Sequence, residues 1–164
     1  MIRIFALALA LLLGACGLHP MYAGGSSGTV ASGLTTIQVA PIPERAGWLV
    51  RNALVDRLGG EAASPTYRLE VVLDDDIIAF GIRGDSAATR ERRTLRARYR
   101  LFELKTGELV LDATAGSDAG IDIVSSPYAT VAAEQTAQER LATIIADQMV
   151  SRIALFVRRR TAEQ

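Results

Sequence analysis

The sequence has little of what an active site or a metal centre is usually built from. The 164 residues include one cysteine, Cys16, and one histidine, His19. Aromatic residues make up 5% of the chain, and Lys105 is the only lysine. A triad of the serine-hydrolase kind needs a histidine base. His19 lies close to Cys16, which we expect to carry lipid, and we expect no active-site cleft there. With no glycine-rich phosphate loop either, the sequence predicts no enzyme activity and no cofactor.

The charges exclude another class of function. Lys+Arg and Asp+Glu are 18 each, so the chain has no net charge. A nucleic-acid-binding domain usually carries a clear basic excess, and we therefore expect no nucleic-acid partner.

The start of the chain has the pattern of a signal peptide. Arg3 precedes an unbroken apolar run from Ile4 to Leu13. A membrane-spanning helix needs about 20 apolar residues, so this run is too short to be one. A positive start, a short apolar core and small residues at 14–15 indicate a secretory signal over residues 1–15.

Cys16 follows this signal directly. The sequence Leu13-Gly14-Ala15-Cys16 resembles the bacterial lipobox, in which the peptidase cuts before the cysteine. The resemblance implies a diacylglycerol on the thiol and a third acyl chain on the new amino terminus, enough for firm anchoring. The alternative is an ordinary secreted protein with a buried cysteine. The residue after Cys16 is Gly17. An Asp at that position resembles an inner-membrane retention signal, so its absence favours the periplasmic face of the outer membrane.

The rest of the chain predicts one domain behind a linker. Residues 16–33 form the lipidated amino terminus and a flexible linker, since Gly24–Gly33 reads GGSSGTVASG. Residues 34–160 form the folded body. We expect strands at 34–42, 67–80, 90–104 and 109–120 and helices at 47–60 and 127–158. The predicted fold class is α+β, with two helices packed on one face of a four-stranded mixed sheet in the order β-α-β-β-β-α.

The third strand carries the most informative polar pattern. Leu95, Ala97, Tyr99 and Leu101 alternate with arginines, so the arginines should face away from the helices. Like charges about 6.6 Å apart repel one another unless an opposite charge compensates them. Neighbouring carboxylates such as Glu70, Asp74 and Asp112 are one source of compensating charge. The other is an external partner, either the phosphates of a lipid head group or an acidic wall of a partner protein. The candidate contact residues for that partner are Arg92, Arg96, Arg98 and Arg100.

One carboxylate cluster could in principle bind a metal. Asp74 and Asp76 lie on the same face of a strand, and carboxylate oxygens suit Ca²⁺. A charged strand end is the simpler explanation of the cluster, so we predict no metal site.

Several segments, taken in order, resemble the alphaproteobacterial form of the lipopolysaccharide-assembly lipoproteins of the LptE family. They are CGLHPMY at 16–22, RNALVDRL at 51–58, YRLEVVL at 67–73 and SPYATVAAEQTAQERLATIIADQM at 126–149. The chain departs from the family pattern at Leu18 and Met21, which flank the anchor.

The resemblance implies a function that composition alone does not. Members of this family are non-enzymatic partners of the outer-membrane β-barrel LptD, plug its lumen, help it to assemble and bind lipopolysaccharide. The expected partners are thus LptD, lipopolysaccharide and, through the lipid anchor, the membrane. An auxiliary lipoprotein of a periplasmic ABC lipid-transport system is the alternative.

Overall fold

The computed structural model describes residues 28–82 and 88–162. Cys16, the signal peptide and most of the expected linker lie outside this part of the chain. The elements in chain order are α2 (Thr29–Leu34), β1 (Ile37–Val39), α3 (Glu44–Leu58), β2 (Tyr67–Ile82), β3 (Ala88–Glu103), β4 (Leu109–Asp122) and α4 (Pro127–Ala162).

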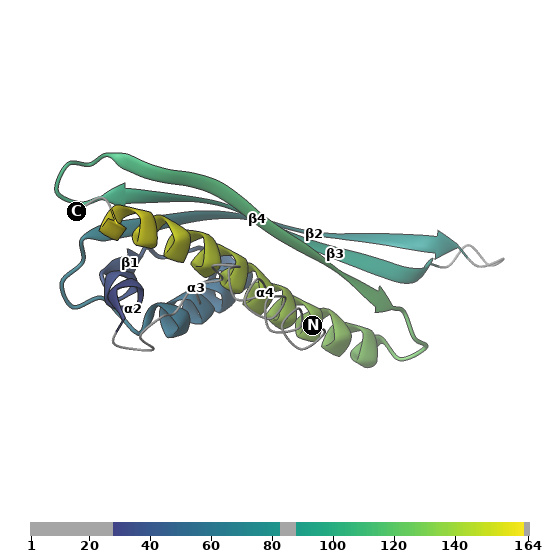
Figure 1. Cartoon of the computed structure of the whole chain (residues 1–164). Coiled ribbons are helices and arrows are strands. Elements are labelled where there is room, and N and C mark those ends of the chain that lie inside the picture. The colour runs from purple at the N-terminus through teal and green to yellow at the C-terminus, as the bar shows by residue number, and fades with distance from the viewer. Residues whose placement is uncertain (1–27, 83–87, 163–164) are drawn as a thin grey trace, which may run out of the picture.

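The strands form one mixed sheet with the helices on one face (Figure 1). The order in the sheet is β1-β2-β3-β4; β1 pairs with β2 in parallel and the other pairs are antiparallel. Gly107 has φ 72° in the β3–β4 turn, a conformation that favours glycine there. The α+β class and the four-stranded mixed sheet are confirmed.

The structure differs from the expectation at the end of the linker. Residues 29–34 form the helix α2, and the first strand shortens from 34–42 to Ile37–Val39. Val30 and Leu34, four residues apart on α2, are both buried. Gly33 packs so closely on α4 that an added Cβ would stand 2.4 Å from a Val157 methyl. Burial of these two side chains outweighs the glycine- and serine-rich composition that predicted a linker.

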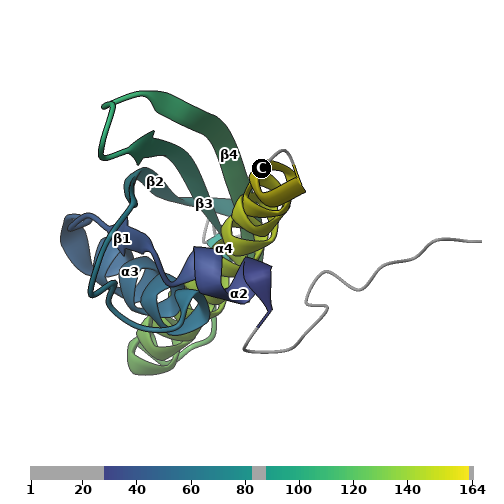
Figure 2. The same cartoon turned by 60° about the vertical axis from the view of Figure 1, so that its left-hand side comes forward.

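The core lies between the helix face of the sheet and α3 and α4. Leu54 of α3, Leu95 of β3 and Ile145 of α4 are fully buried. Figure 2 shows the helices stacked beneath the curved sheet. None of the helices in the described residues has the length and apolar character to cross a bilayer.

Candidate functional site

The arginines of β3 lie on the sheet face opposite the helices. Leu95, Ala97, Tyr99 and Leu101 are at most 1% exposed. Arg92, Arg96 and Arg98 are exposed and Arg100 is half-buried, all on the other face. The alternation expected from the sequence is therefore confirmed. We call this surface the outer face.

Most arginines of the outer face have a carboxylate partner on a neighbouring strand. The nitrogen–oxygen distances are 2.8 Å for Arg90–Asp122, 3.1 Å for Arg96–Asp118, 2.8 Å for Arg98–Asp112 and 3.4 Å for Arg100–Glu70. Two of these acids, Glu70 and Asp112, were expected from the sequence. Asp118 and Asp122 were not, although they share the two-residue period of Asp112 along β4.

The outer face therefore carries both positively and negatively charged side chains, a set that we call the charge lattice. Strand register places six arginines and six carboxylates on it: Arg68, Arg90, Arg92, Arg96, Arg98, Arg100, Glu70, Asp74, Asp76, Asp112, Asp118 and Asp122. The expected repulsion between like charges is largely compensated within the sheet.

Arg92 differs from its neighbours. Among the described residues it forms no ion pair, and its guanidinium carbon lies 5.4 Å from the ring centre of Phe80. Its cross-strand neighbours are Ile78, which is exposed, and Gly120, where an added Cβ would meet open space. Arg92 is thus the candidate arginine with the greatest freedom to meet an external anion.

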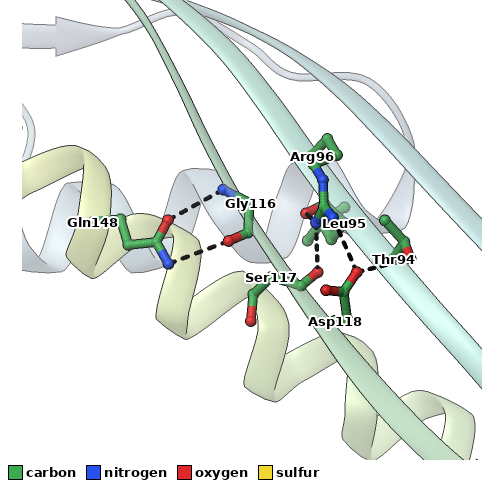
Figure 3. A network of polar contacts seen from close by, with 7 residues as sticks. All are labelled: Thr94, Leu95, Arg96, Gly116, Ser117, Asp118 and Gln148. Atoms are coloured by element: carbon green, nitrogen blue, oxygen red, sulfur yellow. Dashed lines mark hydrogen bonds and ion pairs between the residues drawn. The ribbon is translucent and has the colours of Figure 1, made fainter.

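An open hollow of about 600 Å³ lies at the middle of the outer face. Its lining includes Val72, Asp74, Arg96, Arg98, Thr114, Gly116 and Gln148. Figure 3 shows Arg96 lying across β4, where it donates to the Ser117 carbonyl at 3.1 Å and to Asp118. A Cβ at Gly116 would stand 2.5 Å from the Arg96 side chain, so glycine is what allows this position.

Gln148 of α4 reaches the same strand from the other side (Figure 3). Its amide accepts from the Gly116 N–H at 3.1 Å and donates to the Gly116 carbonyl at 3.3 Å. This contact could not be predicted from the sequence, because Gln148 lies on the polar side of an amphipathic helix.

For two acids of the outer face, Asp112 and Asp118, the neighbouring groups favour the charged form. Hydrogen bonding from Arg98 lowers the pKa of Asp112, and the same contact raises the pKa of Arg98. The Thr94 hydroxyl and the Arg96 charge lower the pKa of Asp118. The lowered pKa values thus strengthen the negative charge that Asp112 and Asp118 present to Arg98 and Arg96.

A second polar cluster lies on the helix face of the sheet. Arg93 donates to both Asp75 oxygens, at 2.8 Å and 2.6 Å, and to the Glu134 carbonyl at 3.2 Å. Gln138 donates to Asp75 at 2.9 Å. Burial pushes the pKa of Asp75 upward, but the bonds from Arg93 and Gln138 outweigh it and the pKa lies below its usual range. This cluster connects the β2–β3 hairpin to α4, and we call it the joint. It was not predicted from the sequence, because Asp75 and Arg93 break the apolar pattern of the buried face.

Glu91, beside this joint, gives a pH-dependent prediction. Its Oε2 is buried and has no hydrogen-bond partner in the described part of the chain, and burial together with Glu134 raises the pKa of Glu91. A folded-state pKa above the unfolded value lowers stability as pH rises through the interval between the two. We expect Glu91→Gln to melt a few degrees above the unsubstituted protein at pH 8, with the difference vanishing near pH 4. Parallel thermal melts across this range measure it, and an unchanged difference at the two pH values would contradict it.

Among residues 28–82 and 88–162, no group of three or more His, Cys, Asp or Glu side chains is placed to hold a metal. Asp74 and Asp76 lie on the outer face, whereas Asp75 between them binds Arg93. The outer face is a polar surface with internally paired charges.

Known proteins resemble this chain in sequence and in fold. The family model LptE, described as lipopolysaccharide-assembly, matches residues 34–153. The crystal structure of a predicted lipoprotein of Caulobacter crescentus is 30% identical, with a TM-score of 0.68 over 81% of this chain and 98% of the other. Comparison with curated protein sequences gives no match.

Two more distant structures share the fold. A minor lipoprotein of Acinetobacter baumannii is 14% identical, with a TM-score of 0.60 over 74% of this chain and 92% of the other. The rare lipoprotein B of Shewanella oneidensis is 8% identical, with a TM-score of 0.59 over 79% and 98%.

Proposed function

The chain belongs to the LptE family of lipopolysaccharide-assembly proteins, and from this premise we propose that it forms a plug-and-barrel complex with the outer-membrane barrel LptD. In this role, which is non-enzymatic, it assists assembly of the barrel and delivery of lipopolysaccharide to the outer leaflet. It is held at the periplasmic face of the outer membrane by acyl chains on Cys16.

The charge lattice of the outer face is the observation that carries this proposal. The lumen of an outer-membrane barrel is polar and hydrated. A plug that enters it needs a polar surface without a large excess of either sign, and the paired arginines and carboxylates provide one. Arg96, Arg98 and Arg100 then contact the barrel wall, and Arg92 is the arginine available to a lipopolysaccharide phosphate.

The test is recovery of the barrel from membranes. The tagged lipoprotein, extracted in detergent, should bring down one large outer-membrane barrel whose electrophoretic mobility changes on heating. Recovery of an ABC transporter subunit or substrate-binding component, with no barrel, would instead establish the alternative function.

The anchor makes its own prediction. Cys16→Ala should give an uncleaved precursor or unlipidated material, because the thiol is the attachment point for the diacylglycerol. Mass spectrometry of the unsubstituted mature protein should show an amino-terminal Cys16 carrying acyl chains. Any other amino terminus contradicts the proposed anchor.

The outer-face arginines can be tested separately from stability. Arg96→Gln with Arg98→Gln should change the melting temperature little, since exposed ion pairs contribute only about 0–1 kcal/mol each. The same variant should recover less barrel and bind lipopolysaccharide more weakly, most clearly at low salt. Arg45→Gln with Arg140→Gln, two exposed arginines of α3 and α4, is the matched control. Equal barrel recovery and equal lipopolysaccharide binding by both variants would show that the outer face is only solvated surface.

A further inference from the structure

Strand β2 has an open edge beyond its short partner β1. The two strands pair only from Tyr67 to Leu69 of β2, whereas β2 continues to Ile82 (Figure 1). The last contact is a hydrogen bond of 2.9 Å from the Ala40 N–H to the Leu69 carbonyl. In the part of the chain that the structure describes, no strand lies beside β2 on this side from Val71 onward.

The residues after β1 explain why the pairing stops. Pro41 and Pro43 have no N–H to donate to a neighbouring strand. Ile42 between them packs on α3 instead, so closely that an added Cβ at Gly47 would stand 2.6 Å from the Ile42 carbonyl oxygen. Glu44 then begins α3 with φ 67°, a left-handed conformation uncommon for a residue with a side chain. The chain therefore leaves the sheet and does not cover the rest of β2.

The backbone groups along the open edge are available for pairing. The Leu69 carbonyl faces β1, and residues of a strand alternate between facing one neighbour and facing the other. The residues whose N–H and carbonyl groups face the open edge are therefore Val71, Leu73, Asp75 and Ile77. Among the described residues, no backbone hydrogen bond reaches these groups from the open side. Such an edge is a template for strand addition.

On the helix side, the open edge borders a small pocket. The pocket has a volume of about 130 Å³ and lies between β2 and the start of α3. Its lining is mostly aliphatic and includes Ile42, Pro43, Glu44, Ala46, Val71 and Leu73. A strand added beside β2 would direct every second side chain toward this side of the sheet. An aliphatic side chain there would bury its surface in the pocket.

On the outer face, the open edge is acidic. Asp74 and Asp76 are exposed there, and within the described residues neither forms an ion pair. Arg96 is the cross-strand neighbour of Asp74, but it extends across β4 to Asp118. Asp76 lies opposite Thr94, which is uncharged. The cations of the charge lattice thus leave two carboxylates at this edge without compensation.

The charges exclude the occupants that this chain could supply. Pairing of β2 with β2 of a second copy would bring Asp74 and Asp76 close to the same acids, and like charges across a strand pair are destabilising. The other edge strand, β4, is also acidic on its outer face, with Asp112, Asp118 and Asp122. Residues 17–27 contain no lysine or arginine, so the preceding segment offers no matching charge.

We propose that the open edge of β2 is a strand-addition site for an extended segment of another protein, with Lys or Arg at alternate positions and aliphatic residues between them. The cations lie beside Asp74 and Asp76, and the aliphatic side chains face the pocket. The backbone of the segment pairs with the four residues that face the edge, Val71, Leu73, Asp75 and Ile77. The site belongs to the folded domain and depends neither on the lipid anchor nor on the barrel complex.

Amide hydrogen exchange with a model peptide tests the pairing. The probe is a short synthetic peptide in which lysine and valine alternate, added to the isotope-labelled mature lipoprotein in a neutral detergent. At a peptide concentration ten times the dissociation constant, exchange at the four edge-facing amides should slow by about tenfold. The amides of Val72, Asp74 and Asp76 face β3 and should change little. NMR resolves the two sets residue by residue.

Charge variants test the side-chain contacts. Asp74→Asn with Asp76→Asn should weaken binding of the fluorescent peptide, measured by anisotropy, by about three- to thirtyfold, as expected for two exposed ion pairs. Asp56→Asn with Glu108→Gln removes two exposed acids elsewhere and should leave binding unchanged. A peptide with glutamate in place of lysine should not bind, and added salt should weaken binding of the lysine peptide.

Each contrary result overturns the proposal. These results are no binding of the lysine peptide, slowed exchange without the alternation between neighbouring amides, slowed exchange along β4 instead, and equal binding by the two double variants. Sedimentation of the protein without peptide checks the remaining occupant, since a dimer that protects the same amides would assign the edge to a second copy. Barrel recovery from membranes reports on the proposed function independently.

Discussion

Replacing Ile145 with Asp is expected to unfold the domain. Ile145 is fully buried on the face of α4 that packs against the sheet, one turn from both Leu141 and Met149. A carboxylate there would be desolvated without a partner, at a cost of more than about 4 kcal/mol. Since single domains are stable by only about 5–15 kcal/mol, most of the folded population should be lost.

Thermal melts by circular dichroism on the domain from Gly28 onward measure this effect. Starting at Gly28 keeps α2, whose Val30 and Leu34 are part of the core. Thr143→Asp, an exposed position on the same helix, controls for the lower helix propensity of Asp. An unchanged melt for Ile145→Asp would mean that this helix face is exposed in solution.

Replacing Arg93 with Met should have the next largest effect. The Arg93 and Asp75 side chains are each only 12% exposed, and removing one partner leaves the other charge buried and uncompensated. Such losses typically cost about 3–5 kcal/mol. Arg90→Met removes an arginine whose ion pair with Asp122 is mostly exposed, and it should cost less than about 1 kcal/mol.

Chemical denaturation of the two variants gives the comparison. Adding Asp75→Leu to Arg93→Met should restore much of the lost free energy of unfolding, because the double substitution leaves neither charge buried. A loss for Arg93→Met no larger than that for Arg90→Met would show that water reaches the joint freely.

The features predicted correctly are those that a period of two or 3.6 residues determines. Alternation in 95–101 placed the arginines outward, and the apolar spacing along α4 placed Ile145 inward. Both follow from backbone geometry, which is local. The family resemblance in the chain supplied the functional class, and the family model supports it.

The features that were missed depend on contacts between distant segments. The helix α2 forms because Val30 and Leu34 find α4 more than a hundred residues later, which no composition of residues 24–33 reveals. The pairing of Arg96 with Asp118 needs the register of β3 against β4. The Asp75–Arg93 joint needs the position of Gln138 and Glu134 on α4 as well.

The contact between Gln148 and Gly116 has a consequence for solubility. Strand β4 is the longer of the two edge strands of the sheet. An unpaired strand edge is a template to which other chains can add. The side-chain amide of Gln148 hydrogen-bonds to both the backbone N–H and the backbone carbonyl of Gly116. A neighbouring strand would use the same two groups. Helix α4 thereby closes the edge near its midpoint. The contact therefore leaves less of this edge open to edge-to-edge pairing with other chains.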